Sequence, residues 1–336
     1  MKILNASILI ILISLSSCGT KRWGNPTGIE IEVPAEARIN HGHSFEVNTY
    51  LVFDSGKRKD MSRSSDLTFA VKGAQVDGKK FRIEGMPTQF GSDTVWLRAQ
   101  LNYKDSLYSS TKEIPFNYKG DLNIDLSGEQ GQAGPNGSSG GTPIVFRDGK
   151  DGDDGGIGLP GMSGHDIQVH VYKNDSGLYK LRLISLITNE TYYFTNKDVG
   201  FPIIIGVRGG KGGNGGAGGS GGDGKDGKKT DKKEKLPGDG GNGGNGGQGG
   251  NGGNGGSVYL FIHPTAADIQ SRITVYNTGG AGGDAGAGGA AGRPGSALEN
   301  QTEGIEGNSG LPGPEGIPGA SGEATVITVE PFDIDF

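Results

Sequence analysis

Residues 240–257 read GGNGGNGGQGGNGGNGGS, six consecutive triplets that each begin with two glycines. The same phase of three recurs over much of the second half of the chain, which has 67 glycines among 336 residues. Further blocks with glycine at every third position occupy residues 128–140, 149–164, 209–227, 280–295 and 304–322. A period of three is that of a polyproline-II-type helix, which has no internal hydrogen bonds. Its backbone groups therefore need water or neighbouring chains as partners.

Three arrangements of these blocks are open: a bundle of several helices within one chain, a collagen-like trimer, and disordered glycine loops. Residues 209–227 and 240–255 contain no proline to stiffen them, and no block exceeds seven triplets. Apolar β-type segments also separate several blocks, whereas a collagen stalk would read as one unbroken run. We favour the intramolecular bundle, in which 209–227 runs out and 240–255 returns. Such an arm would reach roughly 55 Å at ~3.1 Å per residue.

The segments between the blocks alternate apolar and polar residues with a period of two, which predicts strands. The predicted strands are 143–147, 167–173, 178–186, 191–195, 203–208, 258–263, 273–277 and 324–330. We interpret them as one sheet or sandwich from which the glycine arms project. The predicted fold class is mainly β: an immunoglobulin-like sandwich, then a β-sheet domain that carries glycine-triplet, polyproline-II-type helical arms. The predicted arms of this second domain, residues 121–336, are 128–140, 149–164, 209–256 and 280–322.

Residues 28–120 resemble a small antiparallel sandwich of the bacterial immunoglobulin-like kind by strand number and spacing alone. Asp77-Gly78 marks a tight hairpin turn. Trp96 is interpreted as the central core aromatic, with stacking on a carbohydrate as the less favoured alternative. His41 and His43 have no acidic or cysteine neighbour in sequence, so we interpret them as part of a turn rather than as a metal site.

Met1-Lys2 and the apolar stretch 8–15 form a secretory signal peptide that is too short to span a membrane. It ends at Leu15-Ser16-Ser17-Cys18-Gly19, which resembles the lipobox of bacterial lipoproteins. That resemblance implies removal of residues 1–17, acylation of Cys18, and a lipid-anchored tether over 18–27. Gly19 does not match the inner-membrane retention signal of the family, so an outer-membrane location is expected. The basic residues after it do not decide the face of that membrane.

Two charged clusters are candidate sites. Asp148, Asp151, Asp153 and Asp154 are a weak calcium candidate, for which a solvated acidic loop is the favoured interpretation. A lysine cluster lies between two predicted arms and is either a soluble hairpin tip, which we favour, or a contact for anionic polysaccharide or lipid headgroups. The members of this cluster are Lys228, Lys229, Lys232, Lys233 and Lys235.

Composition narrows the classes of function. The net charge of −6 disfavours nucleic-acid binding, and one cysteine excludes an intrachain disulfide framework. No catalytic constellation is visible, so we expect neither an enzyme nor a cofactor. Together the lipobox and triplets resemble bacterial outer-membrane lipoproteins with collagen-like or polyglycine-II-type Gly-X-Y repeats.

The resemblance implies a lipid-anchored cell-envelope protein with a structural or adhesion role and a protein or polysaccharide partner. The alternative is a glycan-binding accessory lipoprotein of polysaccharide uptake, with exposed aromatics as its binding residues. The candidates for that role are Tyr172, Tyr179, Tyr192 and Tyr193.

Overall fold

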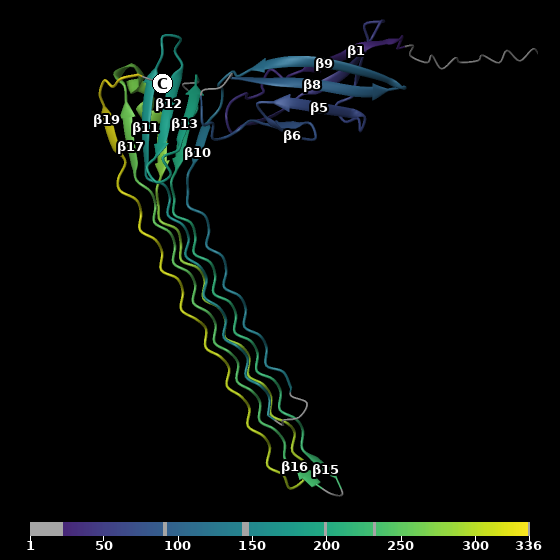
Figure 1. Cartoon of the computed structure of the whole chain (residues 1–336), viewed down its shortest axis with the longest axis vertical. Coiled ribbons are helices and arrows are strands. Elements are labelled where there is room, and N and C mark those ends of the chain that lie inside the picture. Colours follow the sequence, from purple (N-terminus) through teal and green to yellow (C-terminus); the bar gives the residue numbers. More distant parts are fainter. Residues whose placement is uncertain (1–22, 90–92, 143–147, 198–199, 231–232, 335–336) are drawn as a thin grey trace, which may run out of the picture.

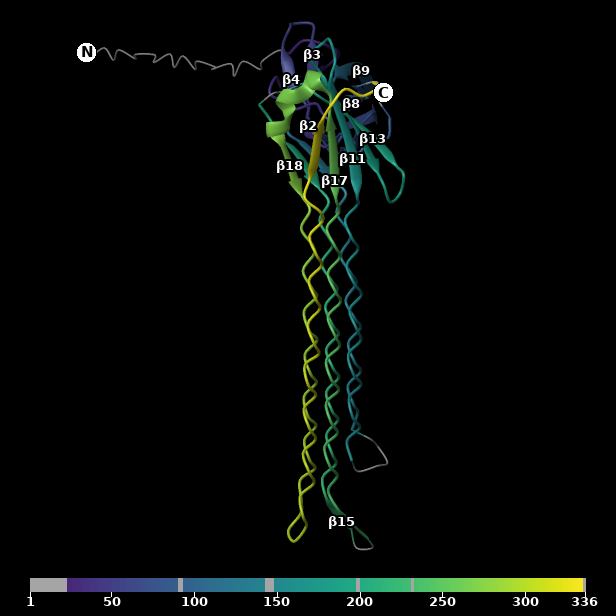
Figure 2. The same ribbon diagram turned by 90° about the vertical axis from the view of Figure 1, so that its left-hand side faces the viewer.

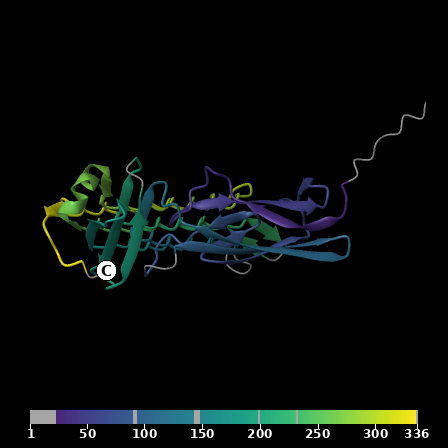
Figure 3. The ribbon, with the colours of Figure 1, turned by 90° about the horizontal axis from the view of Figure 1, so that it is seen from above.

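A computed structural model describes residues 23–89, 93–142, 148–197, 200–230 and 233–334. This part of the chain is mainly β, as predicted, and contains a single 3-10 helix. It comprises an N-terminal module, a head, and a long bundle of glycine-rich segments that projects from the head (Figure 1). Viewed from above, the N-terminal module extends to one side of the head (Figure 3). Cys18, Lys232 and the predicted strand 143–147 lie outside the described residues.

Nine strands form three antiparallel sheets in the N-terminal module, ordered β1-β3-β4, β2-β7-β6 and β5-β8-β9. Alternating apolar side chains of these strands meet in one core that includes Leu51, Phe81 and Leu97. The strands are β1 Pro26–Glu32, β2 Ser44–Glu46, β3 Asn48–Phe53, β4 Arg58–Asp60, β5 Leu67–Lys72, β6 Gln75–Asp77, β7 Lys80–Arg82, β8 Thr94–Tyr103 and β9 Ser106–Pro115.

Local details of this module differ from the sequence prediction. The hairpin at Asp77 is confirmed, but Asp77 pairs with Lys80, so the two-residue loop is Gly78-Lys79, with Gly78 at φ +60°. The alternation of Ile114, Phe116 and Tyr118 predicts a last strand that reaches Tyr118, but β9 ends at Pro115, and Tyr118 has a left-handed φ of +53° that an extended strand cannot contain. β9 instead begins at Ser106 and pairs with β8 along its whole length.

The head is built from two sheets, ordered β10-β14-β18 and β13-β12-β11-β17-β19. Their facing side chains form a second apolar core that includes Ile124, Val169, Leu183 and Ile205. The strands are β10 Leu122–Asp125, β11 Ile167–Lys173, β12 Tyr179–Ser185, β13 Thr191–Asn196, β14 Ile203–Gly206, β17 Val258–Ile262, β18 Ile273–Tyr276 and β19 Val326–Val329.

Two elements of the head were not predicted. β10 is only four residues long and lies just before the first glycine block, where its pattern is too short to stand out. The 3-10 helix η1, Pro264–Arg272, contains a kink at Ala266 and buries only Ala266 and Ile269. A helix this short and irregular shows no sustained 3.6-residue pattern in the sequence.

Six glycine-rich segments, which we number arms 1 to 6, run side by side from the head (Figures 1 and 2). In chain order they are residues 128–142, 148–166, 207–227, 238–257, 277–297 and 304–325. The short hairpin of β15 Lys228–Thr230 and β16 Lys233–Lys235 joins arms 3 and 4 at their far end. Odd-numbered arms lead away from the head and even-numbered arms return to it.

The arms continue the sheets of the head. β10, β14 and β18 are parallel neighbours and lead into arms 1, 3 and 5, while arms 2, 4 and 6 lead into the parallel neighbours β11, β17 and β19. Backbone hydrogen bonds between the arms keep the same order, so that two rows of three arms, 1-3-5 and 2-4-6, face each other. The parallel registers of the head therefore fix which arms become neighbours.

Candidate interaction surfaces

Hydrogen bonds from glycine N–H groups hold the arms together at every third residue. Along arm 3, Gly210, Gly213 and Gly216 donate to carbonyls of arm 2, while Gly212 and Gly215 donate to arm 5. Arm 4 donates in the same way to arms 3 and 6, at N···O distances of 2.7–2.9 Å. Backbone groups of the arms thereby find partners inside one chain.

The packing leaves no space for side chains between the arms. A Cβ built on Gly246 would lie 1.9 Å from the carbonyl oxygen of Gly286, and one on Gly247 would lie 1.9 Å from that of Gly156. Arms 3 and 4 touch neighbours on several sides, which explains why most of their triplets have two glycines. Arms 1 and 6, at opposite ends of their rows, have mostly one.

Steric exclusion, rather than backbone freedom, explains these glycines. Among the described residues, positive φ occurs at seven glycines, and none of them lies in an arm. Arm 5 is packed as tightly against arm 6, because a Cβ on Gly282 or Gly288 would lie 2.0 Å from a carbonyl oxygen of arm 6, although alanine stands at the equivalent triplet position at Ala285 and Ala291.

Polar side chains at the third position of the triplets form a ladder along the outer face of row 2-4-6. The Oδ1 atoms of Asn242, Asn245, Asn251 and Asn254 in arm 4 accept hydrogen bonds from backbone N–H groups of arm 6, at 2.8–3.0 Å. In arm 6, the glycine N–H groups donate to arm 5 in the facing row, and the N–H groups of the next residues donate to these asparagines. These residues are exposed, yet they connect neighbouring arms.

The acidic cluster belongs to the same ladder. The Oδ1 atoms of Asp148, Asp151 and Asp154 accept from the backbone N–H groups of Asp239, Asn242 and Asn245, at 3.0, 2.6 and 2.6 Å. Asp153 takes part instead through its backbone, which bonds to arms 1 and 3. The structure thus lines up three of the four carboxylates along arm 2. In the part of the chain that the structure describes, no group of three or more His, Cys, Asp or Glu side chains could hold a metal ion.

The lysine cluster lies at the far end of arms 3 and 4. All residues of β15 and β16 are exposed, and Lys228 pairs directly with Lys235 across the hairpin, while Lys229 pairs with Glu234. Like charges in directly opposite positions destabilise a hairpin. Gln301, in the turn between arms 5 and 6, donates to Glu234 Oε1 at 2.7 Å and so connects the two turns.

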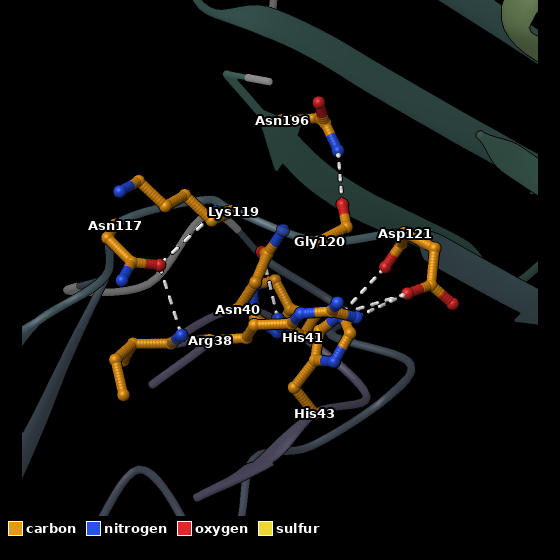
Figure 4. A network of polar contacts seen from close by, with 10 residues as sticks. Arg38, Asn40, His41, His43, Asn117, Lys119, Gly120, Asp121 and Asn196 are labelled. Carbon is orange, nitrogen blue, oxygen red and sulfur yellow. Dashed lines mark hydrogen bonds and ion pairs between the residues drawn. The ribbon is translucent and has the colours of Figure 1, made fainter. Parts of the chain in front are cut away.

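A polar joint connects the N-terminal module to the head (Figure 4). His43 Nε2 lies 2.7 Å from the backbone oxygen of Asp121, and Arg38 forms an ion pair with the Asp121 carboxylate at 3.3 Å. Asn196 of the head donates to the backbone oxygen of Gly120 at 3.4 Å. The turn predicted at 41–43 is present, and the backbone N–H of His43 donates to the Asn40 carbonyl across it at 3.2 Å. An acidic partner for His43 that is distant in sequence was missed, because only the fold brings Asp121 close.

His41 occupies the centre of this joint. Its ring packs edge-on against Phe116 of the module and Phe194 of the head, at centroid distances of 5.1 and 6.3 Å. Nδ1 lies 3.0 Å from the backbone oxygen of Glu84. Burial lowers the pKa of His41 below its ordinary value, and the hydrogen bond to Glu84 offsets only part of that effect.

Trp96 is not the core aromatic that we predicted. Val95, Leu97 and Ala99 of β8 are buried in the core, so the alternating Trp96 lies on the opposite face of the sheet. There it lines a hollow of about 570 Å³. Among the candidate tyrosines, Tyr179 is fully buried and donates its hydroxyl to Asp268 at 2.6 Å, which excludes it as a surface platform.

Comparisons with protein families and with curated proteins give no match for this chain. Within the described ranges, no helix has the length and apolar character needed to cross a bilayer.

Proposed function

We propose that this protein is a cell-envelope interaction protein, attached to the outer membrane through acylated Cys18, which displays a polyglycine-II-type bundle. The observation that supports it best is the set of six arms in two facing rows, with glycine N–H groups bonded to neighbouring arms at every third residue. A period of three with all hydrogen bonds between helices is what polyproline-II-type geometry requires. On this proposal the N-terminal module is an immunoglobulin-like sandwich that separates head from membrane.

The bundle suits a role in presentation rather than in catalysis. Arms 3 and 4, of 21 and 20 residues, extend the chain by roughly 60 Å at ~3.1 Å per residue, and the hairpin of β15 and β16 lies at their far end. Bonds to several neighbours hold each inner arm, which favours a stiff projection over a flexible linker. The hairpin accordingly presents cationic side chains at a fixed distance from the head, where an envelope partner with anionic groups can reach them.

The test uses photo-crosslinking in intact cells. A crosslinking amino acid replaces Lys229 at the tip in one strain and Ser109 on β9 of the N-terminal module in another. We expect crosslinks to a reproducible envelope component from the tip position and not from the module position. Changing the tip lysines at 228, 233 and 235 to glutamine should reduce these crosslinks several-fold.

A matched control changes three exposed lysines of the N-terminal module to glutamine, at 59, 80 and 119, and so removes the same charge. This control should leave the tip crosslinks unchanged. Equal loss in both variants would mean that net charge, rather than the tip, determines the contact. No crosslinks from the tip in cells that carry the protein in their outer membrane would contradict the proposed interaction role.

A further inference from the structure

We propose that the hollow beside Trp96 is a binding site for a neutral saccharide. This inference does not depend on the proposed role of the bundle, because the site lies in the N-terminal module at its junction with the head. Lys72, Trp96 and Glu113 occupy directly paired positions on β5, β8 and β9, on the face of this sheet that points away from the core. An indole on this face has no packing role in the core.

The walls of the hollow come from separate parts of the fold. The β5-β8-β9 sheet contributes Trp96 and its two neighbours, the segment after β7 contributes Glu84 and Pro87, and the joint contributes His41 and Phe116. The backbone oxygen of Pro87 accepts a hydrogen bond from Tyr193 of the head at 2.9 Å, so this wall is fixed to the head. A volume of about 570 Å³ lies within the range of ~300–1,000 Å³ for ligand pockets, which occur preferentially at domain junctions.

The chemistry of the lining suits a sugar with free hydroxyl groups. A half-buried indole provides a flat apolar face for the C–H groups of a pyranose ring. Glu84, Asp93 and Glu113 supply carboxylate acceptors around it, and Lys72 supplies a donor. Adjacent hydroxyls, which both donate and accept, can bond to both kinds of group at once. Asp93 is held in place by the Tyr118 hydroxyl, which donates to Oδ2 at 2.6 Å.

Charge selects a neutral ligand over the two charged alternatives. Three carboxylates against one ammonium group disfavour an anionic sugar in this hollow. An external cation would compete with Lys72, whose Nζ already lies 5.8 Å from the centroid of the Trp96 ring. Neutral hydroxyl groups are neither repelled by the carboxylates nor in competition with Lys72.

Tryptophan fluorescence can test the site directly, because the chain contains only Trp23 and Trp96. Trp23 packs against Phe53 with the two rings tilted by 44°, and both lie outside the hollow, so Trp23→Phe leaves Trp96 as the single reporter. The chain from residue 19 onward, with this substitution, is titrated with neutral hexasaccharides of glucose, mannose, galactose and N-acetylglucosamine. We expect a saturable change in emission with at least one of them.

Calorimetry then compares the unmodified tryptophans with Trp96→Ala. Loss of the stacking platform should weaken binding of the active hexasaccharide by roughly tenfold or more, since tenfold corresponds to about 1.4 kcal/mol. Trp23→Phe is the matched control and should bind normally. Unfolding midpoints of both variants should stay close to that of the parent, because neither change opens the core.

Three results would overturn the proposal: no response to any of the neutral sugars, equal binding by Trp96→Ala, or a response only to a lysine-rich peptide. The last result, with affinity that falls as salt is added, would assign the hollow to a cationic partner instead.

Discussion

Gln248 of arm 4 lies opposite Pro314 of arm 6, at the one level of the outer ladder where arm 6 has no N–H group to donate. At the neighbouring levels, Asn245 accepts from Leu311 and Asn251 from Ile317. Asparagine gives way to glutamine where its hydrogen bond would have no donor. Asparagine therefore occurs at the levels of arm 4 where the backbone of arm 6 offers an N–H group to its side chain. These exposed side chains form hydrogen bonds between the arms.

This relationship yields a paired prediction. Asn245→Ala should lower the free energy of unfolding by about 0.5–1.5 kcal/mol, the usual net contribution of one hydrogen bond. Gln248→Ala, one triplet away and equally exposed, should change it by a few tenths at most. Chemical denaturation of both variants measures the difference. Equal effects would show that the ladder contributes nothing to stability.

Asn245→Ser provides an intermediate case. From the sequence alone this substitution is expected to be nearly silent, because the side chain points outward. The side chain does point outward, but its Oδ1 accepts a hydrogen bond from the backbone N–H of Leu311, so the substitution alters a contact between arms 4 and 6. Serine acceptors reach the same ladder at longer distances, 3.3 Å for Ser163 and 3.4 Å for Ser257. We expect a measurable loss of stability, smaller than that of Asn245→Ala.

Gly246→Val tests the close packing of the arms. The new Cβ would lie 1.9 Å from the carbonyl oxygen of Gly286, and the Gly246 N–H bond to Leu311 would be strained as well. We expect a loss of roughly 2–5 kcal/mol, from overpacking together with a damaged hydrogen bond. Amide exchange along arms 4 and 5 should accelerate by at least tenfold.

Gly141→Val is the control for this substitution, because a Cβ at Gly141 meets no atom within 4 Å. It should leave both stability and exchange close to the parent values. Sedimentation should show a monomer for the parent protein. A parent trimer that dissociates on Gly246→Val would instead support a collagen-like assembly.

Stability should fall in acid partly through His41. Burial lowers the pKa of folded His41 below its ordinary value of 6.5. As pH falls through 6.5, the unfolded chain takes up a proton that the folded protein does not, so the free energy of unfolding decreases. The loss stops below the folded pKa, where both states carry the proton. His41→Gln should flatten this part of the pH profile measured by denaturation, and an unchanged slope would contradict the assignment.

Cys18→Ala should release the protein from the outer membrane or block its processing. The expectation follows from the lipobox resemblance, in which this cysteine carries the acyl chains. Membrane fractionation after a carbonate wash measures it. A variant that still sediments with the outer membrane would show that another attachment exists.

Much of the fold could be predicted from local patterns. Alternation located the strands at Ile167, Val258 and Ile273, and the period of three marked the arm segments. The pairing of arms with sheets could not be predicted, because it depends on parallel registers such as Ile124 beside Ile205, which join residues far apart in the chain. The joint between the module and the head could not be predicted for the same reason, because His43 and Asp121 are far apart in the sequence and only the fold brings them together.

Trp96 shows a different limit. Its alternation with Val95 and Leu97 places it on the opposite face from them, but alternation alone does not say which face is buried. Since Val95, Leu97, Ala99 and Leu101 form the more apolar set, their face becomes the core. A comparison of the two faces of β8, rather than of Trp96 by itself, would have predicted that Trp96 lies outside the core.

The two-row bundle also constrains how its length can change over evolution. Arm 1 donates its last hydrogen bond to arm 3 at Gly140, whereas arm 3 continues to donate to arm 5 as far as Gly227, so the hairpins already differ in length. Gain or loss of whole triplets near a tip leaves the head and the phase of every remaining glycine untouched. An insertion of one or two residues would instead turn side chains into the contacts between arms. Viable length variants should therefore differ by multiples of nine nucleotides, concentrated where the arms reverse direction.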